Sequence, residues 1–182
     1  MCNSQNIEKR KIICVDLETT GLNPFDDEIL QLSIINGNNE ILFNEYIKPK
    51  NKTSWVAAEK IHGISPEDVK DLPTISKHIN ELNMIFENAE IIIGYNLISF
   101  DRYFLIEVGI NIPDDIEYYD VMFEFAPIYG ECNDYFGDYK WQSLYTCSKY
   151  YDYDWSNENL YNSLSKAKAT LHCFNKMTQS LL

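Results

Sequence analysis

The chain has 182 residues, of which 45% are hydrophobic and 24% are charged, and its formal net charge at pH 7 is −13. This composition supplies one hydrophobic core and too little length for two comfortable domains, so we expect a single domain over residues 1–182. The negative charge argues against a protein that coats nucleic acid by bulk electrostatics, but it leaves room for a small basic or metal-loaded cleft.

The sequence also indicates in which compartment of the cell the protein is expected. Its apolar runs are cut by polar residues well short of a membrane span, and the N-terminal stretch "MCNSQNIEKRKIICVD" lacks the hydrophobic region of a signal peptide. The five cysteines are odd in number and show no close paired spacing, which favours neither a disulfide framework nor a zinc site. We therefore expect a cytoplasmic protein with reduced thiols and no membrane contact.

The first half of the chain begins with strand patterns. A β-branched run at 11–16 is followed by two further runs, 28–35 and 41–47, on either side of an Asn-Gly turn signal. Helical spacing then covers 54–65 and 74–89, with Thr74 placed as an N-cap candidate. This order predicts an antiparallel three-strand start followed by a helical excursion.

The second half continues the alternation. The almost wholly apolar "EIIIGYN" at 90–96 predicts a buried strand, "FDRYFLIEVGI" a helix, and "IEYYDVM" a fifth strand that runs into a helix. The remainder is tyrosine-rich and helical in pattern, and its last helix places apolar residues on one face: Leu164, Ala167, Leu171, Phe174 and Leu181. We predict a layered α/β domain with a mixed sheet, in which the 28–47 hairpin is antiparallel to the first strand and 90–94 is parallel to it.

The stretch "CVDLETTGLNP" carries the first candidate site. Alternation along a strand places Asp16 and Glu18 on one face, two residues apart, so their carboxylates can share one cation. The plainer alternative is that both are ordinary acids at a strand end that leads into a Thr-Thr-Gly turn.

A second acidic candidate follows the buried strand. In "GYNLISFDRYF", Asp101 falls in the first turn of a helix beyond the carboxyl end of that strand, where α/β sheets place their sites. An aspartate in this position can also serve only to complement the helix dipole. Taken alone, Asp101 favours that structural interpretation.

Together the motifs are more specific. "VDLETTG", "KIHGIS" about forty residues later, and "GYNLISFD" resemble, in order and spacing, the DnaQ-like 3′–5′ exonucleases, including the epsilon subunit of DNA polymerase III. The resemblance implies an RNase H-like three-layer fold with a mixed five-stranded sheet flanked by helices. It implies Mg²⁺ or Mn²⁺ held by Asp16, Glu18 and Asp101. It further implies substrate contacts from a second set: Thr19, Gly21, His62, Asn96 and Phe100. For His62 a structural hydrogen bond to backbone is an equal alternative.

The last motif of the family departs here. In the histidine-bearing branch it has the pattern "HxxLxDAxAT", and the stretch at 161–170 is "YNSLSKAKAT". The matching residues fix the register, so Tyr161 takes the place of the histidine and Lys166 that of the aspartate. Tyrosine hydroxyls ordinarily titrate near ~10 and are poor general bases at neutral pH. An ammonium cannot ligate a metal, so we expect at most one weakly held ion.

Other residues offer little compensation. An alternative interpretation of Lys166 is that it is a solvated helix residue whose side chain points away from the cleft. His172 lies on a different side of the same helix, and His78 matches no motif. Glu158, like Asp152 and Asp154, precedes the motif, and we do not expect any of these three acids to replace the missing aspartate.

These observations lead to three hypotheses of function. The first is an exonuclease-family protein with impaired or lost catalysis that still binds the 3′ end of single-stranded nucleic acid. The second is an active exonuclease with a reorganised one-metal site. The third is a catalytically inert module that binds a protein partner through its acidic surface and its tyrosines between 118 and 161. The sequence does not indicate an oligomeric state.

Overall fold

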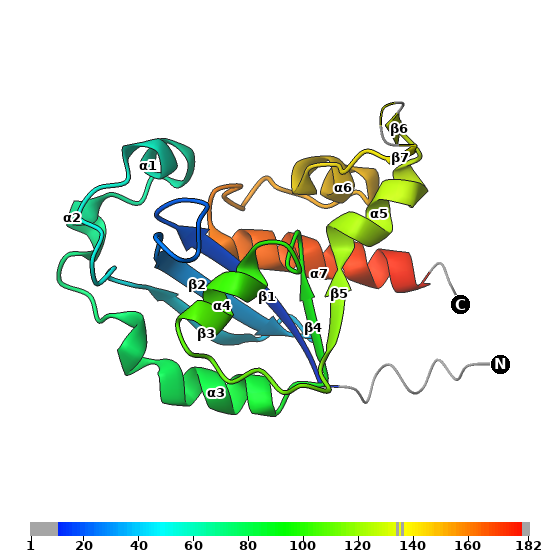
Figure 1. Ribbon diagram of the computed structural model, residues 1–182. Helices are drawn as coiled ribbons and strands as arrows, with labels where there is room; N and C mark the ends of the chain where they lie inside the picture. The colour runs from blue at the N-terminus through cyan, green and yellow to red at the C-terminus, as the bar shows by residue number, and fades with distance from the viewer. Residues whose placement is uncertain (1–10, 134, 136, 180–182) are drawn as a thin grey trace.

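The computed structural model describes residues 11–133, 135 and 137–179. Its centre is a five-stranded sheet in the order β3-β2-β1-β4-β5 (Figure 1). The strand bounds are β1 Ile12–Thr19, β2 Ile29–Asn36, β3 Ile41–Tyr46, β4 Ile91–Gly94 and β5 Glu117–Asp120. β1 pairs antiparallel with β2 and parallel with β4, while β2–β3 is antiparallel and β4–β5 parallel. The predicted mixed sheet, its hairpin and the parallel fourth strand are therefore confirmed.

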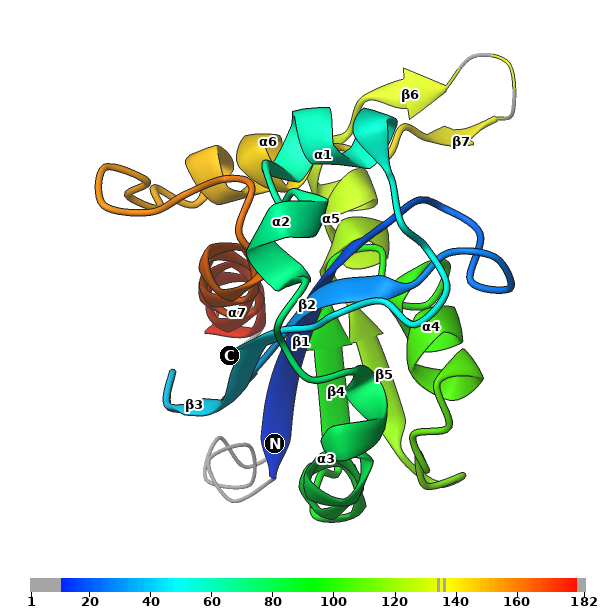
Figure 2. The same ribbon diagram turned by 90° about the vertical axis from the view of Figure 1, so that its left-hand side faces the viewer.

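Helices cover both faces of the sheet, which makes three layers (Figure 2). The helix bounds are α1 Val56–His62, α2 Pro66–Val69, the 3₁₀ helix η2 Ile75–Lys77, α3 Ile79–Glu87, α4 Asp101–Glu107, α5 Val121–Tyr129, α6 Leu144–Tyr150 and α7 Ser163–Gln179. α3 and α4 contribute to one core cluster with one face of the sheet, whereas α5, α6 and α7 contribute to a second cluster on the other face. Among the described residues, no helix is both long and apolar enough to cross a bilayer.

The last helix packs as its apolar spacing predicts. Ala167, Leu171 and Phe174 are buried, and Leu164 packs against the same cluster at its edge. Leu181, the fifth residue of the predicted face, lies outside the described residues. α7 crosses β1, β2 and β4, so its first turn lies over the carboxyl-terminal half of β1.

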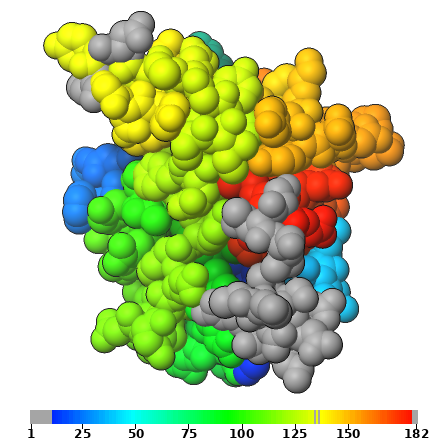
Figure 3. Space-filling view, turned by 90° about the vertical axis from the view of Figure 1, so that its right-hand side faces the viewer, coloured from blue at the N-terminus to red at the C-terminus, as the bar shows by residue number. Residues whose placement is uncertain are grey.

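The prediction missed or shifted some local features. Thr74 precedes η2, but its hydroxyl contacts Ser76 Oγ at 2.8 Å instead of capping a backbone N–H. A two-stranded hairpin, β6 Cys132–Asn133 with β7 Asp138–Tyr139, projects beyond α5 (Figure 3). Its strands are too short to give an alternating pattern, which explains why the sequence did not show it.

Four cysteines fall in the described part of the chain, and all four are free thiols: Cys14, Cys132, Cys147 and Cys173. Only Cys132 is exposed, and the other three are buried within the α7 side of the core. Cys2 lies outside the described residues.

Candidate active site

Asp16 and Glu18 lie near the carboxyl end of β1, in the middle of the sheet. Both are buried, with 6% and 8% of their surface exposed. They are opposite Ser33 and Gln31 of β2, and the register shifts immediately after Glu18. The alternation of the strand therefore places the two carboxylates on one face, as predicted from their spacing.

Asp101 joins them from the other side of β1. Its carboxylate accepts a hydrogen bond from the backbone N–H of Leu17 at 3.1 Å, so it contacts the residue between Asp16 and Glu18. Asp101 is only 4% exposed and is the first residue of α4. The fold thus brings together three acids that are up to 85 positions apart in the sequence.

Asp120, which the sequence analysis did not single out, fixes the loop that leads to Asp101. It is buried at the end of β5, and its carboxylate accepts hydrogen bonds from the backbone N–H groups of Asn96, Ile98 and Met122 at 2.9–3.1 Å. It therefore binds the 95–100 loop to the start of α5. The signal was an aspartate near the end of the predicted strand "IEYYDVM", where that strand runs into a helix.

Lys166 points into the carboxylate cluster. Its Nζ lies 2.7 Å from Asp16 Oδ2 and 3.0 Å from Glu18 Oε1, and it approaches the carbonyl oxygen of Leu17 at 3.4 Å. The alternative in which Lys166 is a solvated residue directed away from the cleft is therefore wrong. The sequence could not settle this point, because the direction of a long side chain depends on how the helix is rotated against the sheet.

The electrostatics of this cluster favour a charged lysine. Burial alone would lower the pKa of Lys166, but the charges of Asp16 and Glu18 outweigh burial and raise it above its ordinary value. Burial also raises the pKa of Asp101 to about 7, although the Lys166 charge and the Leu17 N–H oppose that shift. One ammonium thus faces three buried carboxyl groups.

A buried polar network holds the first turn of α7 against the sheet. The side-chain oxygen of Gln31 accepts hydrogen bonds from the backbone N–H of Ser163 and from Asn162 Nδ2, both at 3.2 Å. Ser33 Oγ and Ser163 Oγ are 2.6 Å apart, and both residues are fully buried. Since Ser163 precedes Lys166 by about one helical turn, the network fixes the point from which the lysine reaches the carboxylates.

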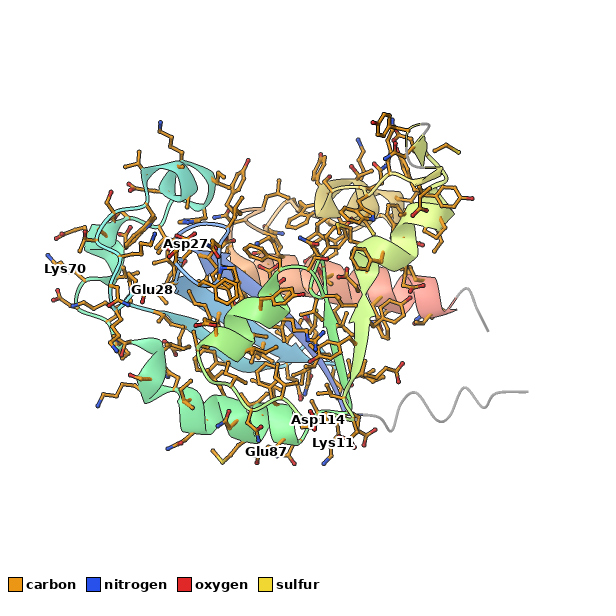
Figure 4. All side chains as sticks on the ribbon, in the orientation of Figure 1. Lys11, Asp27, Glu28, Lys70, Glu87 and Asp114 are labelled. Atoms are coloured by element: carbon orange, nitrogen blue, oxygen red, sulfur yellow. The ribbon has the colours of Figure 1, made fainter. Side chains whose placement is uncertain are left out.

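The turn after β1 is built from the residues that the resemblance assigned to substrate. Thr19 Oγ1 donates to the carbonyl oxygen of Gly21 at 2.6 Å. A side chain at Gly21 would collide with the Asp27 carboxylate, which accepts from Thr20 Oγ1 at 3.1 Å. The neighbouring Glu28 accepts three backbone N–H groups from residues 50–52 (Figure 4). The closeness of the Asp27 carboxylate to Gly21 therefore already explains why this position holds a glycine.

His62 is held by backbone contacts. Its Nδ1 accepts from the N–H of Ile64 at 3.0 Å, so in the neutral ring Nε2 carries the proton and donates to the carbonyl oxygen of Thr19 at 3.2 Å. This arrangement fits the structural alternative for His62. It ties the "IHGIS" loop to the end of β1.

Asn96 and Phe100 occupy the loop between β4 and α4. Asn96 adopts a left-handed conformation with φ 64°, which asparagine tolerates better than most residues. The Phe100 ring packs on Phe104 with 5.0 Å between ring centroids. Both residues therefore lie in the loop that Asp120 holds.

The remaining candidates have hydrogen-bond or ion-pair partners outside the carboxylate cluster. Tyr161 is 55% exposed in the turn before α7, and its N–H donates to Asn159 Oδ1. Glu158 pairs with Lys168 at 3.0 Å and accepts from Ser165 Oγ. The other two histidines have partners elsewhere, His172 at the Tyr151 carbonyl and His78 at Glu81 and the Phe43 ring.

The donor set of this cluster differs from what the implied divalent cations require. Within the described ranges, no group of three or more histidine, cysteine, aspartate or glutamate side chains is arranged to hold a metal ion. The Lys166 ammonium contacts one oxygen of Asp16 and one of Glu18, the two carboxylates expected to share a cation. As folded, these residues do not fit a two-cation site.

Comparison with known proteins places this geometry in a family. The RNase_T model, described as "Exonuclease", matches residues 13–126. The DNA polymerase III PolC-type of Thermotoga petrophila is 32% identical over 103 residues, which is 55% of this chain and 7% of that protein. This chain therefore spans only a small part of that curated relative.

Solved structures agree with the fold. E. coli exonuclease I in complex with a dA16 oligonucleotide superposes with a TM-score of 0.71 at 18% identity, over 95% of this chain and 42% of that one. Exonuclease X in complex with 5′ overhanging duplex DNA gives 0.69 at 18% identity, over 93% and 92% of the two chains. Because the family model spans more than half of the sequence, and the sheet and its flanking helices match the solved exonuclease structures, the chain belongs to the DnaQ-like 3′–5′ exonuclease family and has its RNase H-like fold.

Proposed function

We propose that this domain binds the 3′ end of single-stranded nucleic acid and has impaired or lost hydrolytic activity. The observation that carries the proposal is the position of the Lys166 ammonium, 2.7 Å from Asp16 and 3.0 Å from Glu18. A cation that belongs to the protein thus takes up the charge of the carboxylates that would otherwise serve a metal ion.

Charge counting shows why this substitution matters. Because Lys166 stands where the family has an aspartate, the negative charge of the cluster is lower by two units. Mg²⁺ and Mn²⁺ depend on oxygen ligands, usually carboxylates, and an ammonium offers only N–H donors. Phosphodiester hydrolysis in two-metal sites relies on ions ~3.5–4 Å apart that activate the nucleophile and stabilise the leaving group. We therefore derive no hydrolytic step for the site as folded.

The position of Tyr161 supports the same proposal. The family histidine acts as the base that takes a proton from the attacking water, and its near-neutral pKa makes it suitable. Here the position holds a phenol on a half-exposed side chain, in the turn that precedes α7. The chain thus departs from the family at both residues of the last motif.

Binding of a strand end is inferred from the family and from its neighbours. Exonuclease I has been seen with dA16 and with dT13, and exonuclease X with duplex DNA. The net charge of −13 means that such binding here would depend on local contacts more than on bulk attraction. The PolC-type relative suggests a DNA polymerase as a candidate protein partner.

The test is release of nucleotides from a 3′-labelled single strand in Mg²⁺ and in Mn²⁺. We expect nucleotide release by the parent to be at or only slightly above the protein-free blank. Lys166→Asp should restore a ligand but leave the water without its base, and Tyr161→His should do the reverse. The double variant should therefore gain far more than the product of the two singles, since both repairs act on one transition state.

Lys168→Asp combined with Tyr161→His is the matched control, because Lys168 is also ion-paired on α7 and the change alters the charge equally. We expect no gain from it. Hydrolysis by the parent at the rate of the Lys166→Asp/Tyr161→His variant would contradict the proposal and favour the reorganised one-metal site.

A further inference from the structure

A recess adjoins the ion-paired carboxylates on the α6 side. Its volume is about 390 Å³, and its walls are Leu144, Tyr145, Leu160, Tyr161 and Lys166. This volume is near the lower end of the ~300–1,000 Å³ typical of small-molecule sites. Because Lys166 also contacts Asp16 and Glu18, the recess shares this side chain with the candidate active site.

The two tyrosines present aromatic surface to this recess. Tyr145 is 49% exposed and Tyr161 is 55% exposed. Tyr145 comes from the first turn of α6, and Tyr161 from the segment that enters α7. α6 packs against α7 and lies above it in Figure 1, and the two tyrosines reach the recess from different segments.

The α6 wall is held in place by contacts with the rest of the domain. Tyr95 Oη donates to the carbonyl oxygen of Gln142 at 2.7 Å, just before the helix. Ser143 caps α6 by accepting from the N–H of Thr146 at 3.1 Å. The backbone that carries Leu144 and Tyr145 is therefore anchored at the start of α6.

The opposite wall is tied to α6 and α7. The buried Ser148 of α6 accepts the Trp155 indole N–H at 2.8 Å through its hydroxyl and the Tyr153 N–H at 2.8 Å through its carbonyl oxygen. Asn159 receives the N–H of Tyr161 and donates its own N–H to Ser165 Oγ. With both walls fixed, a ligand would have little chain to order on binding.

The chemistry of the walls selects the ligand. Four of the five lining residues are apolar or aromatic, and the charge of the fifth, Lys166, is already neutralised by Asp16 and Glu18. The site is therefore poorly suited to a phosphate and well suited to a flat, uncharged π-system. Bases stack on aromatic side chains in a sequence-tolerant way.

We propose that this recess binds the terminal nucleobase of a single strand, stacked on Tyr145 and Tyr161, without a metal ion. The proposal rests on the function proposed above and deepens it by naming the group that is recognised. Tyr161 then serves as a binding surface at the position where the family places its catalytic histidine.

The test uses a single-stranded oligonucleotide with 2-aminopurine at its 3′ end, in EDTA, with binding followed by anisotropy and by quenching of the base. We expect quenching by the parent, and affinity about 10-fold or more weaker for Tyr145→Ala and for Tyr161→Ala, with loss of quenching. Tyr145→Phe and Tyr161→Phe should keep both signals, because stacking needs the ring and not the hydroxyl. Tyr150→Ala is the control: it lies on the same helix, is 52% exposed and does not line the recess.

The outcomes separate the two proposals. If the parent binds the strand and the alanine variants bind and quench as the parent does, the recess is not the base site and the proposed function stands. If the loss of affinity also occurs in the phenylalanine variants, hydroxyl contacts and not stacking recognise the ligand, and the inference is wrong. If the parent binds no strand at all, both proposals fail.

Discussion

Removal of the Lys166 ammonium should weaken the fold in a pH-dependent way. Lys166→Met keeps most of the aliphatic stem and deletes the charge, which leaves Asp16 and Glu18 facing each other with only 8% and 9% of their side chains exposed. Loss of one partner from a buried ion pair costs ~3–5 kcal/mol. Since Lys166 is 23% exposed and the carboxyl groups can take up a proton instead, we expect about 3 kcal/mol at pH 8.

The pH dependence follows from where the proton goes. Burial raises the pKa of Asp16 and the Lys166 charge opposes that shift, so without the ammonium the pKa of Asp16 should rise further in the folded state, while in the unfolded state it stays near ~4. The folded state then binds more protons than the unfolded state above that pH, so the stability of the variant falls as the pH rises. The deficit relative to the parent should be largest at pH 8 and should shrink towards pH 5.

Urea unfolding followed by tryptophan fluorescence at both pH values measures this difference. Lys168→Met is the control, because its pair with Glu158 is more exposed and should be worth no more than ~1 kcal/mol. Added Mn²⁺ should raise the melting temperature of Lys166→Met more than that of the parent, since binding to the folded state stabilises it. Equal stability of Lys166→Met and the parent at pH 8 would refute the ion-paired arrangement.

Three further predictions concern the residues around the cluster. In the parent, burial raises the pKa of Asp101 to about 7, so its carboxyl group stays protonated in the folded state between pH 4 and pH 7 and the stability should decline by roughly 2–4 kcal/mol over this range. Asp101→Asn should remove this decline, which urea unfolding at several pH values measures. Gly94→Ala should cost ~1–3 kcal/mol of unfolding free energy in urea, since its Cβ would lie 2.6 Å from the Cβ of the buried Leu97. Asp120→Asn should cost ~1–3 kcal/mol and speed hydrogen exchange at the N–H groups of 96 and 98, because the amide can replace only part of the acceptor set.

The sheet was predictable because local patterns determine it, and the grouping of the three acids was implied by the family that the short motifs resemble. The alternation in β1 sets the common face of Asp16 and Glu18, and the apolar run before Asp101 fixes the strand that ends near it. The parallel pairing of β1 with β4 then brings the two sites to the same end of the sheet. The short motifs were sufficient for this part of the site.

The rest depended on long-range packing. Gln31 and Ser33 are polar residues within the otherwise apolar strand β2. Their presence was the one signal in the sequence that the buried face of β2 contacts polar groups. What they meet is Ser163, 132 and 130 positions later, and no local pattern encodes that pairing. The direction of Lys166 follows from this contact, so it could not be predicted from the stretch "YNSLSKAKAT" alone.

The placement of Lys166 has a consequence for how this domain responds to its surroundings. A charge attached to the chain arrives at Asp16 and Glu18 whenever the protein folds, and its effective concentration there is set by the backbone and not by the solution. A free divalent ion must be recruited and loses its water shell on entry. Chelation or scarcity of divalent ions would empty a metal-dependent centre, whereas here the carboxylates keep their counter-charge. The counter-charge of Asp16 and Glu18 therefore does not depend on the supply of divalent ions.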